Sequence, residues 1–209
     1  MQRVAIARTL ITNPSLLMMD EPLANLDTKL RGEMRRFIRN LQQRLGITTI
    51  FVTHDQIEAM ELADRVAVIF DGELAQFDTP DVLYKQPASI EIADFMGATN
   101  VFPAQINGGS AVLKFGTLTL DNKPLDGSGS VMLRSEAIDL HLQALPQTEN
   151  VLQGTIASRD FFGANITYGV TCGDHTVSVT EQSRRVIDVG SRVWLTIPPE
   201  RIWAIKDAP

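Results

Sequence analysis

Cysteine, long apolar runs and a secretory leader are absent or nearly absent from this sequence. Its single cysteine, Cys172, rules out an intramolecular disulfide and a metal cluster built on cysteines, and suits a small packing residue in a reducing compartment. No apolar run approaches the roughly 20 residues of a membrane-spanning helix. The segment after Met1 carries Arg3 and Arg8 and is too charged for a secretory signal. We therefore expect a cytoplasmic chain that does not cross a bilayer.

Basic charge is also scarce. The 209 residues carry a net charge of −6, which disfavours proteins that bind nucleic acid by neutralising its phosphates. Binding of single-stranded nucleic acid would also need a basic groove with exposed aromatic side chains, and only 6% of the residues are aromatic. The hydrophobic fraction of 44% is ordinary for a globular protein, and the length allows one or two domains with a real core.

Two adjacent carboxylates follow an apolar run near the start of the chain. Residues 16–19 lead without alternation into Asp20, Glu21 and Pro22, which is typical of a buried strand covered on both faces. Ligands of open α/β sheets bind where such strands end. We therefore expect Asp20 to hold Mg²⁺ near phosphate groups and Glu21 to position a water molecule. The alternative is that both carboxylates only cap the following turn.

A histidine follows the next expected strand. Residues 47–53 are apolar and β-branched, so they predict a strand that ends at His54. His54 could hydrogen-bond the γ-phosphate of a nucleotide, although a histidine at a strand end is more often an ordinary polar residue. Asp55 and Glu58 have the spacing of a capping box at the start of a helix over residues 56–63.

The other N-terminal segments alternate between helical and extended patterns, which predicts part of a wound α/β domain. Apolar spacing and capping residues predict helices over residues 2–12, 29–45 and 89–96, a short helix opening at 79–81, and a hairpin over 65–78 that turns at Asp71-Gly72. The helix over 29–45 carries five arginines largely off its apolar stripe. We expect a solvated face there, with contact to phosphate or anionic lipid as the alternative.

From residue 98 onward the pattern changes to short apolar runs separated by glycine-rich breaks. This spacing predicts a small β-barrel or sandwich, with residues 143–150 as a polar connector. The breaks include Gly154 and the segment 126–129. Trp194 and Trp203 could stack on a sugar or a base, but their strand spacing favours the core. We expect two domains, residues 1–97 and 98–209.

Four motifs, in order and spacing, resemble the second half of an ATP-binding-cassette (ABC) ATPase. They are QRVAIAR at 2–8, LLMMDEP at 16–22, LANLD at 23–27 and FVTHDQIEA at 51–59. The resemblance implies ATP and Mg²⁺ as cofactors. Asp20 would end the Walker B strand and bind the metal, Glu21 would be the catalytic base, and His54 would be the switch histidine. Asp27 would belong to the D-loop at the nucleotide site.

Further segments resemble the importers of sugars, polyamines, ferric iron and phosphonates; they are residues 77–84, Pro87, residues 95–97 and Asn100. That subfamily implies a second ATPase subunit in a homodimer, transmembrane permease subunits and an external solute-binding protein. It also implies a peripheral position on the cytoplasmic face of the plasma membrane. The transported solute does not follow, because the permease and the binding protein select it.

The β-rich tail resembles the regulatory TOBE domain of the same subfamily, which is built on strands like those of the oligonucleotide/oligosaccharide-binding fold. Residues 131–138 match its Arg-Pro-Glu segment, with Ser135 where proline is usual, and residues 198–205 match its closing strand. The expected fold class is therefore α/β, the C-terminal half of a P-loop ATPase domain, followed by a small all-β domain.

The phosphate-binding loop of such ATPases is missing. The sequence contains no Gly-x-x-x-x-Gly-Lys-Ser/Thr motif, and its first helix has no N-cap residue. We expect the C-terminal part of a cassette, which would be inactive alone. Such a part could arise from a truncated reading frame, a split gene or a cut at an internal methionine. The alternative is a non-catalytic regulatory or binding module that acts through the β domain.

Overall fold

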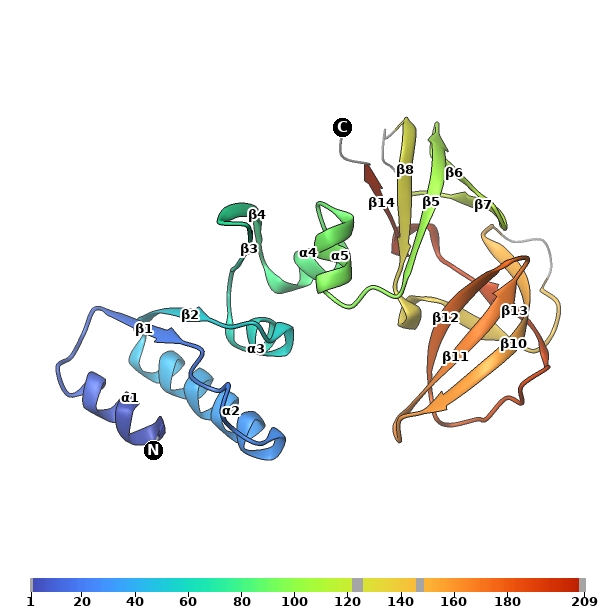
Figure 1. Cartoon of the computed structure of the whole chain (residues 1–209). Coiled ribbons are helices and arrows are strands. Elements are labelled where there is room, and N and C mark those ends of the chain that lie inside the picture. Colours follow the sequence, from blue (N-terminus) through green and yellow to red (C-terminus); the bar gives the residue numbers. More distant parts are fainter. Residues whose placement is uncertain (1, 122–125, 146–148, 207–209) are drawn as a thin grey trace. The chain divides into compact units, whose positions relative to one another are not determined.

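The computed structural model describes residues 2–121, 126–145 and 149–206. The chain forms two compact units, Met1–Leu83 and Tyr84–Pro209, which are treated separately below (Figure 1). The division lies earlier than residue 97 because the helix α5 (Ile90–Phe95) packs with the second unit. Its Ala93 shares an apolar cluster with Met132 and Ile205.

The first unit alternates helices and strands, as the sequence predicts. Its elements are α1 (Gln2–Leu10), β1 (Leu16–Asp20), α2 (Thr28–Leu45), β2 (Thr48–Val52), α3 (Gln56–Leu62), β3 (Val66–Phe70), β4 (Glu73–Asp78) and the start of α4 (Pro80–Lys85). The strands β3 and β4 form the expected hairpin. Asp71 and Gly72 have φ angles of 50° and 82°, which a two-residue hairpin turn requires and which Gly72 adopts without strain.

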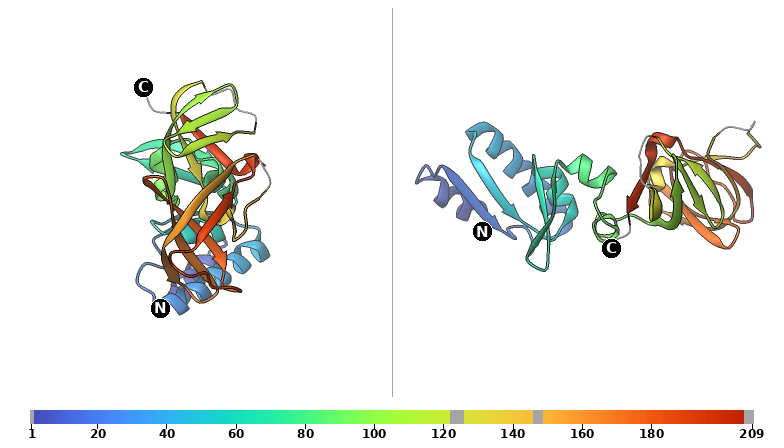
Figure 2. Two further views of the ribbon diagram at one scale, coloured as in Figure 1. Left: turned by 90° about the vertical axis from the view of Figure 1, so that its right-hand side faces the viewer. Right: turned by 90° about the horizontal axis from the view of Figure 1, so that it is seen from above.

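The parallel strands β1 and β2 are covered on one face. Leu17 and Met19 of β1 pack with Ile6 of α1 and with Met34 and Ile38 of α2, and these helices lie on the same side of the strands (Figures 1 and 2). The expectation that β1 is covered on both faces is therefore wrong for this chain as described.

The opposite face of β1 and β2 is apolar and exposed. Leu16, Met18, Ile50 and Val52 are 42%, 69%, 46% and 48% exposed. Leu16 and Met18 alternate with the buried residues of β1, and Met18 lies beside Ile50 in the parallel register. Contiguous exposed apolar surface of this kind is typical of a surface that contacts another polypeptide or a ligand.

The second unit is the β structure that the tail predicts. Its two five-stranded sheets have the orders β14-β8-β5-β6-β7 and β12-β11-β10-β13-β9, and residues of both contribute to one large apolar core (Figure 2). The strands are β5 (Asn100–Asn107), β6 (Ser110–Leu113), β7 (Gly116–Thr119), β8 (Gly127–Leu133), β9 (Asp139–His141), β10 (Val151–Phe161), β11 (Asn165–Cys172), β12 (His175–Gln182), β13 (Arg192–Thr196) and β14 (Ile202–Lys206).

Two glycines that the sequence analysis placed in breaks lie inside strands instead. Gly154 belongs to β10, and a Cβ there would lie 2.6 Å from Val170 Cγ1 and 2.7 Å from the Thr171 carbonyl oxygen. Gly129 belongs to β8, and a Cβ there would lie 2.6 Å from the Ile205 carbonyl oxygen. These glycines permit close approach between neighbouring strands rather than chain reversal.

Buried polar side chains connect strands of the β unit. The Asn100 amide nitrogen donates to the carbonyls of Leu133 and Ser178, and its oxygen accepts from the Ser178 amide at 2.7 Å. Asn150, in the predicted polar connector, is 6% exposed and bonds both backbone groups of Thr119. Residues 146–148 of that connector lie outside the described part of the chain.

The lone cysteine and Trp203 are packing residues. Cys172 is 2% exposed, and burial raises the pKa of its thiol to about 11, which keeps it protonated and unreactive. Trp194 and Trp203 are half-buried, and the Trp203 indole donates to the Pro87 carbonyl at 2.9 Å. Trp203 also packs against the cluster of Ala93, Met132 and Ile205, which supports the core interpretation for Trp203.

Arg134, the arginine of the Arg-Pro-Glu-like segment, is buried and fixes nearby backbone. It is 6% exposed and donates to the carbonyl oxygens of Tyr84 and Met96. Its Cζ lies 3.8 Å from the centroid of the Tyr84 ring, and the Tyr84 hydroxyl donates to Glu136 at 2.6 Å. Ser135, at the usual proline position, accepts from the Thr180 hydroxyl at 3.0 Å. The Arg-Pro-Glu-like segment therefore ties the backbone at Tyr84 and Met96 and strand β12 to one another within this unit.

Replacing Gly154 tests the close approach of β10 and β11. Gly154→Ala should lower the free energy of unfolding of the β unit by about 1–3 kcal/mol, because the added methyl overlaps Val170 and backbone. Urea unfolding followed by tryptophan fluorescence measures the change. Gln153→Ala, an exposed neighbour on the same strand, should stay within about 0.5 kcal/mol of the wild type. Equal stability of the two variants would contradict the close approach.

The Tyr84 hydroxyl predicts a stability loss at alkaline pH. Burial, and then the hydrogen bond to Glu136, raise its pKa from 10.0 to about 12. The unfolded chain therefore ionises first, so this stabilisation is complete below pH 10 and is lost as the pH rises to about 12. The unfolding free energy of the wild type should fall more steeply over that window than that of Tyr84→Phe. Parallel pH profiles would contradict the raised pKa of the half-buried Tyr84 hydroxyl.

Candidate functional site

The site begins with the register of two parallel strands. In this register Asp20, the last residue of β1, pairs with Val52, the last residue of β2. The segments after β1 and β2 therefore leave the sheet at the same edge. Asp20 and Glu21 lie at the end of β1, and Thr53 and His54 follow β2. The Glu21 amide extends the ladder by donating to the Val52 carbonyl at 2.9 Å.

Glu21 and His54 meet at this edge. Nε2 of His54 lies 2.9 Å from Oε1 of Glu21, and the side chains are 86% and 45% exposed. Glu21 has a φ angle of 40°, in the left-handed region that a non-glycine residue rarely adopts. Residues held in such conformations concentrate at functional sites, because the surrounding structure must compensate for the strain. Both predicted catalytic residues are thus brought together.

The loop that carries His54 is fixed by a buried glutamate. Glu58, 3% exposed, accepts from the Thr53 hydroxyl at 2.7 Å, and that hydroxyl accepts from the Asp55 amide at 3.0 Å. Asp55 caps α3 by accepting from the amides of Ile57 and Glu58. The N-cap is as predicted, but Glu58 holds Thr53 in place of the Asp55 amide that a capping box would use.

Asp27 caps the following helix. Its Oδ1 accepts from the Leu30 amide at 3.0 Å, so its carboxylate satisfies a free amide in the first turn of α2. Two α2 arginines pair with acids C-terminal to His54, Arg35 with Glu61 at 2.6 Å and Arg39 with Asp64 at 2.8 Å. These pairs make part of the arginine face an internal contact surface of the unit rather than a purely solvated one.

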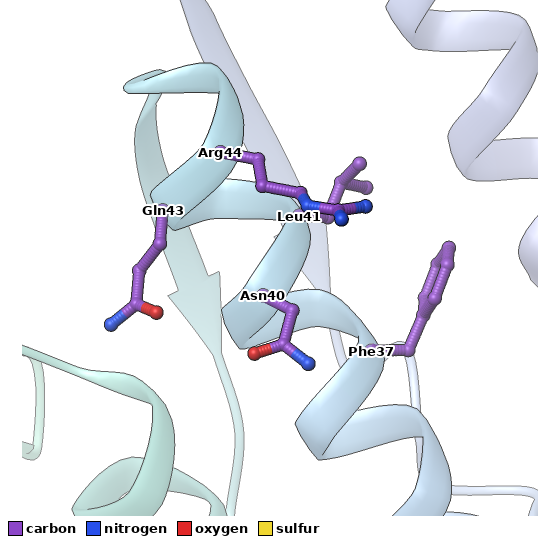
Figure 3. Close-up of a pocket in the computed structure, with 5 residues that line it drawn as sticks. All are labelled: Phe37, Asn40, Leu41, Gln43 and Arg44. Carbon is purple, nitrogen blue, oxygen red and sulfur yellow. The ribbon is translucent and has the colours of Figure 1, made fainter.

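An open hollow of about 490 Å³ lies over the predicted catalytic pair. Its lining combines the first loop, α2 and the His54 loop: Glu21, Ala24, Arg31, Thr53, His54, Asp55, Gln56, Ile57 and Glu58. A second hollow, of about 570 Å³, lies on the far half of α2 and includes none of the predicted site residues (Figure 3). The first hollow is therefore the candidate site.

Asp20 fits Mg²⁺ only in company with a phosphate. Its exposed carboxylate ends β1 at the site edge, but within residues 2–121, 126–145 and 149–206 no three histidine, cysteine or acidic side chains gather as a metal site. Magnesium commonly takes one or two protein carboxylates and completes its shell with substrate phosphates and waters. The donor set here matches that shared mode and does not match a closed protein cage.

Sequence reasoning did not assign Arg31 or Thr53 to this site, and it gave Glu58 only the role of a capping residue. Each acts through a contact with a loop rather than through a recognisable motif; for example, Arg31 lies 3.7 Å from the carboxylate of Asp55. The available signal was the spacing of Thr53 and Glu58, two polar residues five positions apart on either side of His54, which could have indicated their hydrogen bond. No helix among the described residues has the length and apolar character needed to cross a membrane.

Comparisons with curated proteins match import ATP-binding proteins. The TOBE domain model matches residues 131–205. The Fe(3+) ions import ATP-binding protein FbpC of Fusobacterium nucleatum subsp. nucleatum is 37% identical over 210 residues, which cover 96% of this chain and 55% of that protein. The FbpC of Brucella melitensis biotype 1 is 41% identical over 175 residues, 81% of this chain and 48% of that protein.

A polyamine importer component matches equally well. The spermidine/putrescine import ATP-binding protein PotA of Mycoplasmopsis synoviae is 37% identical over 213 residues, which cover 100% of this chain and 46% of that protein. Among solved structures, the cytoplasmic molybdate-binding protein ModG is 12% identical and covers 53% of this chain, with 98% of its own chain aligned and a TM-score of 0.47. The chain spans about half the length of the curated relatives it matches. It is thus homologous, over about half of their length, to ATP-binding subunits of ABC importers such as FbpC and PotA, and its residues 131–205 match the TOBE domain.

Proposed function

We propose that the chain provides the water-activating part of the ATP-hydrolysing site of an importer subunit. The observation that carries this proposal is the contact between Glu21 and His54, 2.9 Å apart at the edge where β1 and β2 end. Two acidic residues and a histidine at that edge match the positioning and charge neutralisation that phosphoryl transfer requires. Homology to import ATP-binding proteins supports the same reaction class.

Each residue has a distinct role in this proposal. Glu21 accepts the proton of the attacking water on one carboxylate oxygen, while its other oxygen is held by Nε2 of His54. His54, whose side chain is 86% exposed, also hydrogen-bonds the terminal phosphate of the nucleotide in this proposal. Asp20 binds Mg²⁺ together with phosphate oxygens, and the bound ion supplies charge neutralisation. Asp27 fixes the loop after Glu21 by capping α2.

The site needs a second segment to become competent. The sequence has no phosphate-binding loop, and the face of β1 and β2 beside the site exposes Met18 and Val52. We propose that an N-terminal half supplies the loop and covers this face. The complete assembly then comprises two ATPase subunits, transmembrane permease subunits and an external solute-binding protein, with the chain peripheral to the cytoplasmic side of the membrane.

ATP hydrolysis tests this function directly. The chain alone should show no magnesium-dependent turnover, and hydrolysis should appear when it is fused to the part of the Fusobacterium nucleatum relative that lies outside the matched region. In that fusion Glu21→Gln should lower kcat by about 10²- to 10⁴-fold, the usual range for a general base. Glu33→Gln, an exposed change on α2, serves as the control. Equal rates for the fusion and its Glu21→Gln variant would reject Glu21 as the base.

Oxidation of adjacent methionines tests whether the exposed sheet face becomes covered. Met18 is 69% exposed and its neighbour Met19 is 8% exposed, so hydrogen peroxide should oxidise Met18 first in the chain alone. Fusion to the relative's remaining part should protect Met18 and leave the slow oxidation of Met19 unchanged. Peptide mass spectrometry measures both rates. Undiminished oxidation of Met18 in an active fusion would show that the added part does not cover this face.

A further inference from the structure

One arginine of α2 contacts both loops that carry the Glu21–His54 pair. We propose that Arg31 is a positioning residue that holds the loop after Glu21 against the loop of His54 and so fixes the geometry of the pair. This inference rests on the ATPase role proposed above and adds a residue to it.

Arg31 first fixes the backbone of the loop after Glu21. Its Nε donates to the Leu26 carbonyl at 2.9 Å and its Nη2 donates to the Ala24 carbonyl at 3.2 Å. The planar guanidinium presents several donors in a rigid fork, so one side chain can hold two carbonyl groups at once. A lysine at this position could not reproduce that geometry.

The same guanidinium then reaches the loop of His54. Its Nη1 lies 3.7 Å from Oδ2 of Asp55, the residue that directly follows His54. Asp55 is itself held, because its Oδ1 accepts from the Ile57 amide at 2.8 Å. Arg31 therefore contacts a fixed carboxylate on one loop and two backbone carbonyls on the other.

The catalytic pair needs this support. Glu21 and His54 are 45% and 86% exposed, and ion pairs at such exposure contribute little because water screens them and their side chains remain mobile. The φ angle of 40° at Glu21 adds strain that the pair itself does not offset. Other contacts must therefore hold the loop, and Arg31 supplies two hydrogen bonds to its carbonyls, of which the one to Leu26 is partly buried.

The position of Arg31 on the helix supports the same conclusion. It follows the N-cap Asp27 by four residues, near the positive end of the α2 dipole, and the first turn of α2 contains no acidic residue. A cation there slightly destabilises the helix by itself. The contacts to Ala24, Leu26 and Asp55 account for an arginine at this position, whereas helix stability does not.

Amide hydrogen exchange on this 209-residue chain tests whether Arg31 holds the loops. In Arg31→Ala the Ala24 and Leu26 amides, which close turns to Glu21 and Leu23, should exchange at least about tenfold faster, because local opening becomes easier. Arg31→Lys should show the same direction with a smaller change. Arg36→Ala, an exposed arginine of the same helix, is the control, and unchanged exchange at Met34 and Ile38 shows that α2 remains folded. Unchanged exchange at Ala24 and Leu26 in both Arg31 variants would overturn the proposal.

Kinetics of the fusion separate positioning from plain structural support. Arg31→Lys should lower kcat about 10- to 100-fold, since small misplacement of reacting groups has effects of this size, while KM for ATP changes less than about threefold. An unchanged kcat, or a loss confined to KM, would overturn the positioning role even if exchange increases. Absence of hydrolysis by the wild-type fusion would contradict the proposed function instead, and the exchange result would still decide whether Arg31 holds the loops.

Discussion

The parallel pairing of β1 and β2 is the constraint on which the candidate site depends. Its register places Asp20 beside Val52, so Glu21 and His54 leave the sheet at one edge and come within 2.9 Å. A shift of one residue would move β1 side chains to the opposite face and separate the pair. The packing of Leu17 and Met19 against α1 and α2 specifies which face is buried and therefore fixes the register.

Around this pairing the first unit distributes its polar contacts unevenly. The pair itself is exposed, whereas the groups that fix its two loops are buried or half-buried: Glu58, Thr53, Asp55 and Arg31. The contacts that fix the loops are therefore the better protected ones, while the Glu21 carboxylate remains exposed to solvent. The β unit depends mainly on its large apolar core, to which buried polar contacts such as those of Asn100 are added.

Local patterns in the sequence were sufficient for most elements and for the residues of the pair. The apolar run before Asp20, the Asp71-Gly72 turn and the Asp55 cap each depend on neighbours in the chain, and the structure contains all three. The carboxylate and the histidine were identified because each lies just after a predicted strand. The TOBE resemblance of the tail is confirmed by the match at residues 131–205.

Features that depend on distant contacts could not be predicted in the same way. Glycine is typical of the breaks between strands, but Gly154 lies inside a strand. It is glycine because Val170 and Thr171 approach too closely for a side chain. The apolar run of β1 indicated two covered faces, and only the packed structure shows that Met18 is exposed. Arg31 and Arg134 act on carbonyl groups that no sequence spacing reveals.

The central claim is that Glu21 and His54 act as one unit, and a double-mutant cycle on kcat in the fused subunit tests it most directly. When two residues act as one unit, removing the second adds little to the loss of kcat caused by removing the first. The double variant Glu21→Gln/His54→Ala should therefore have a kcat close to that of the slower single variant. The account predicts this strong non-additivity. Effects on kcat that multiply independently would contradict it and would show that the 2.9 Å contact has no part in catalysis.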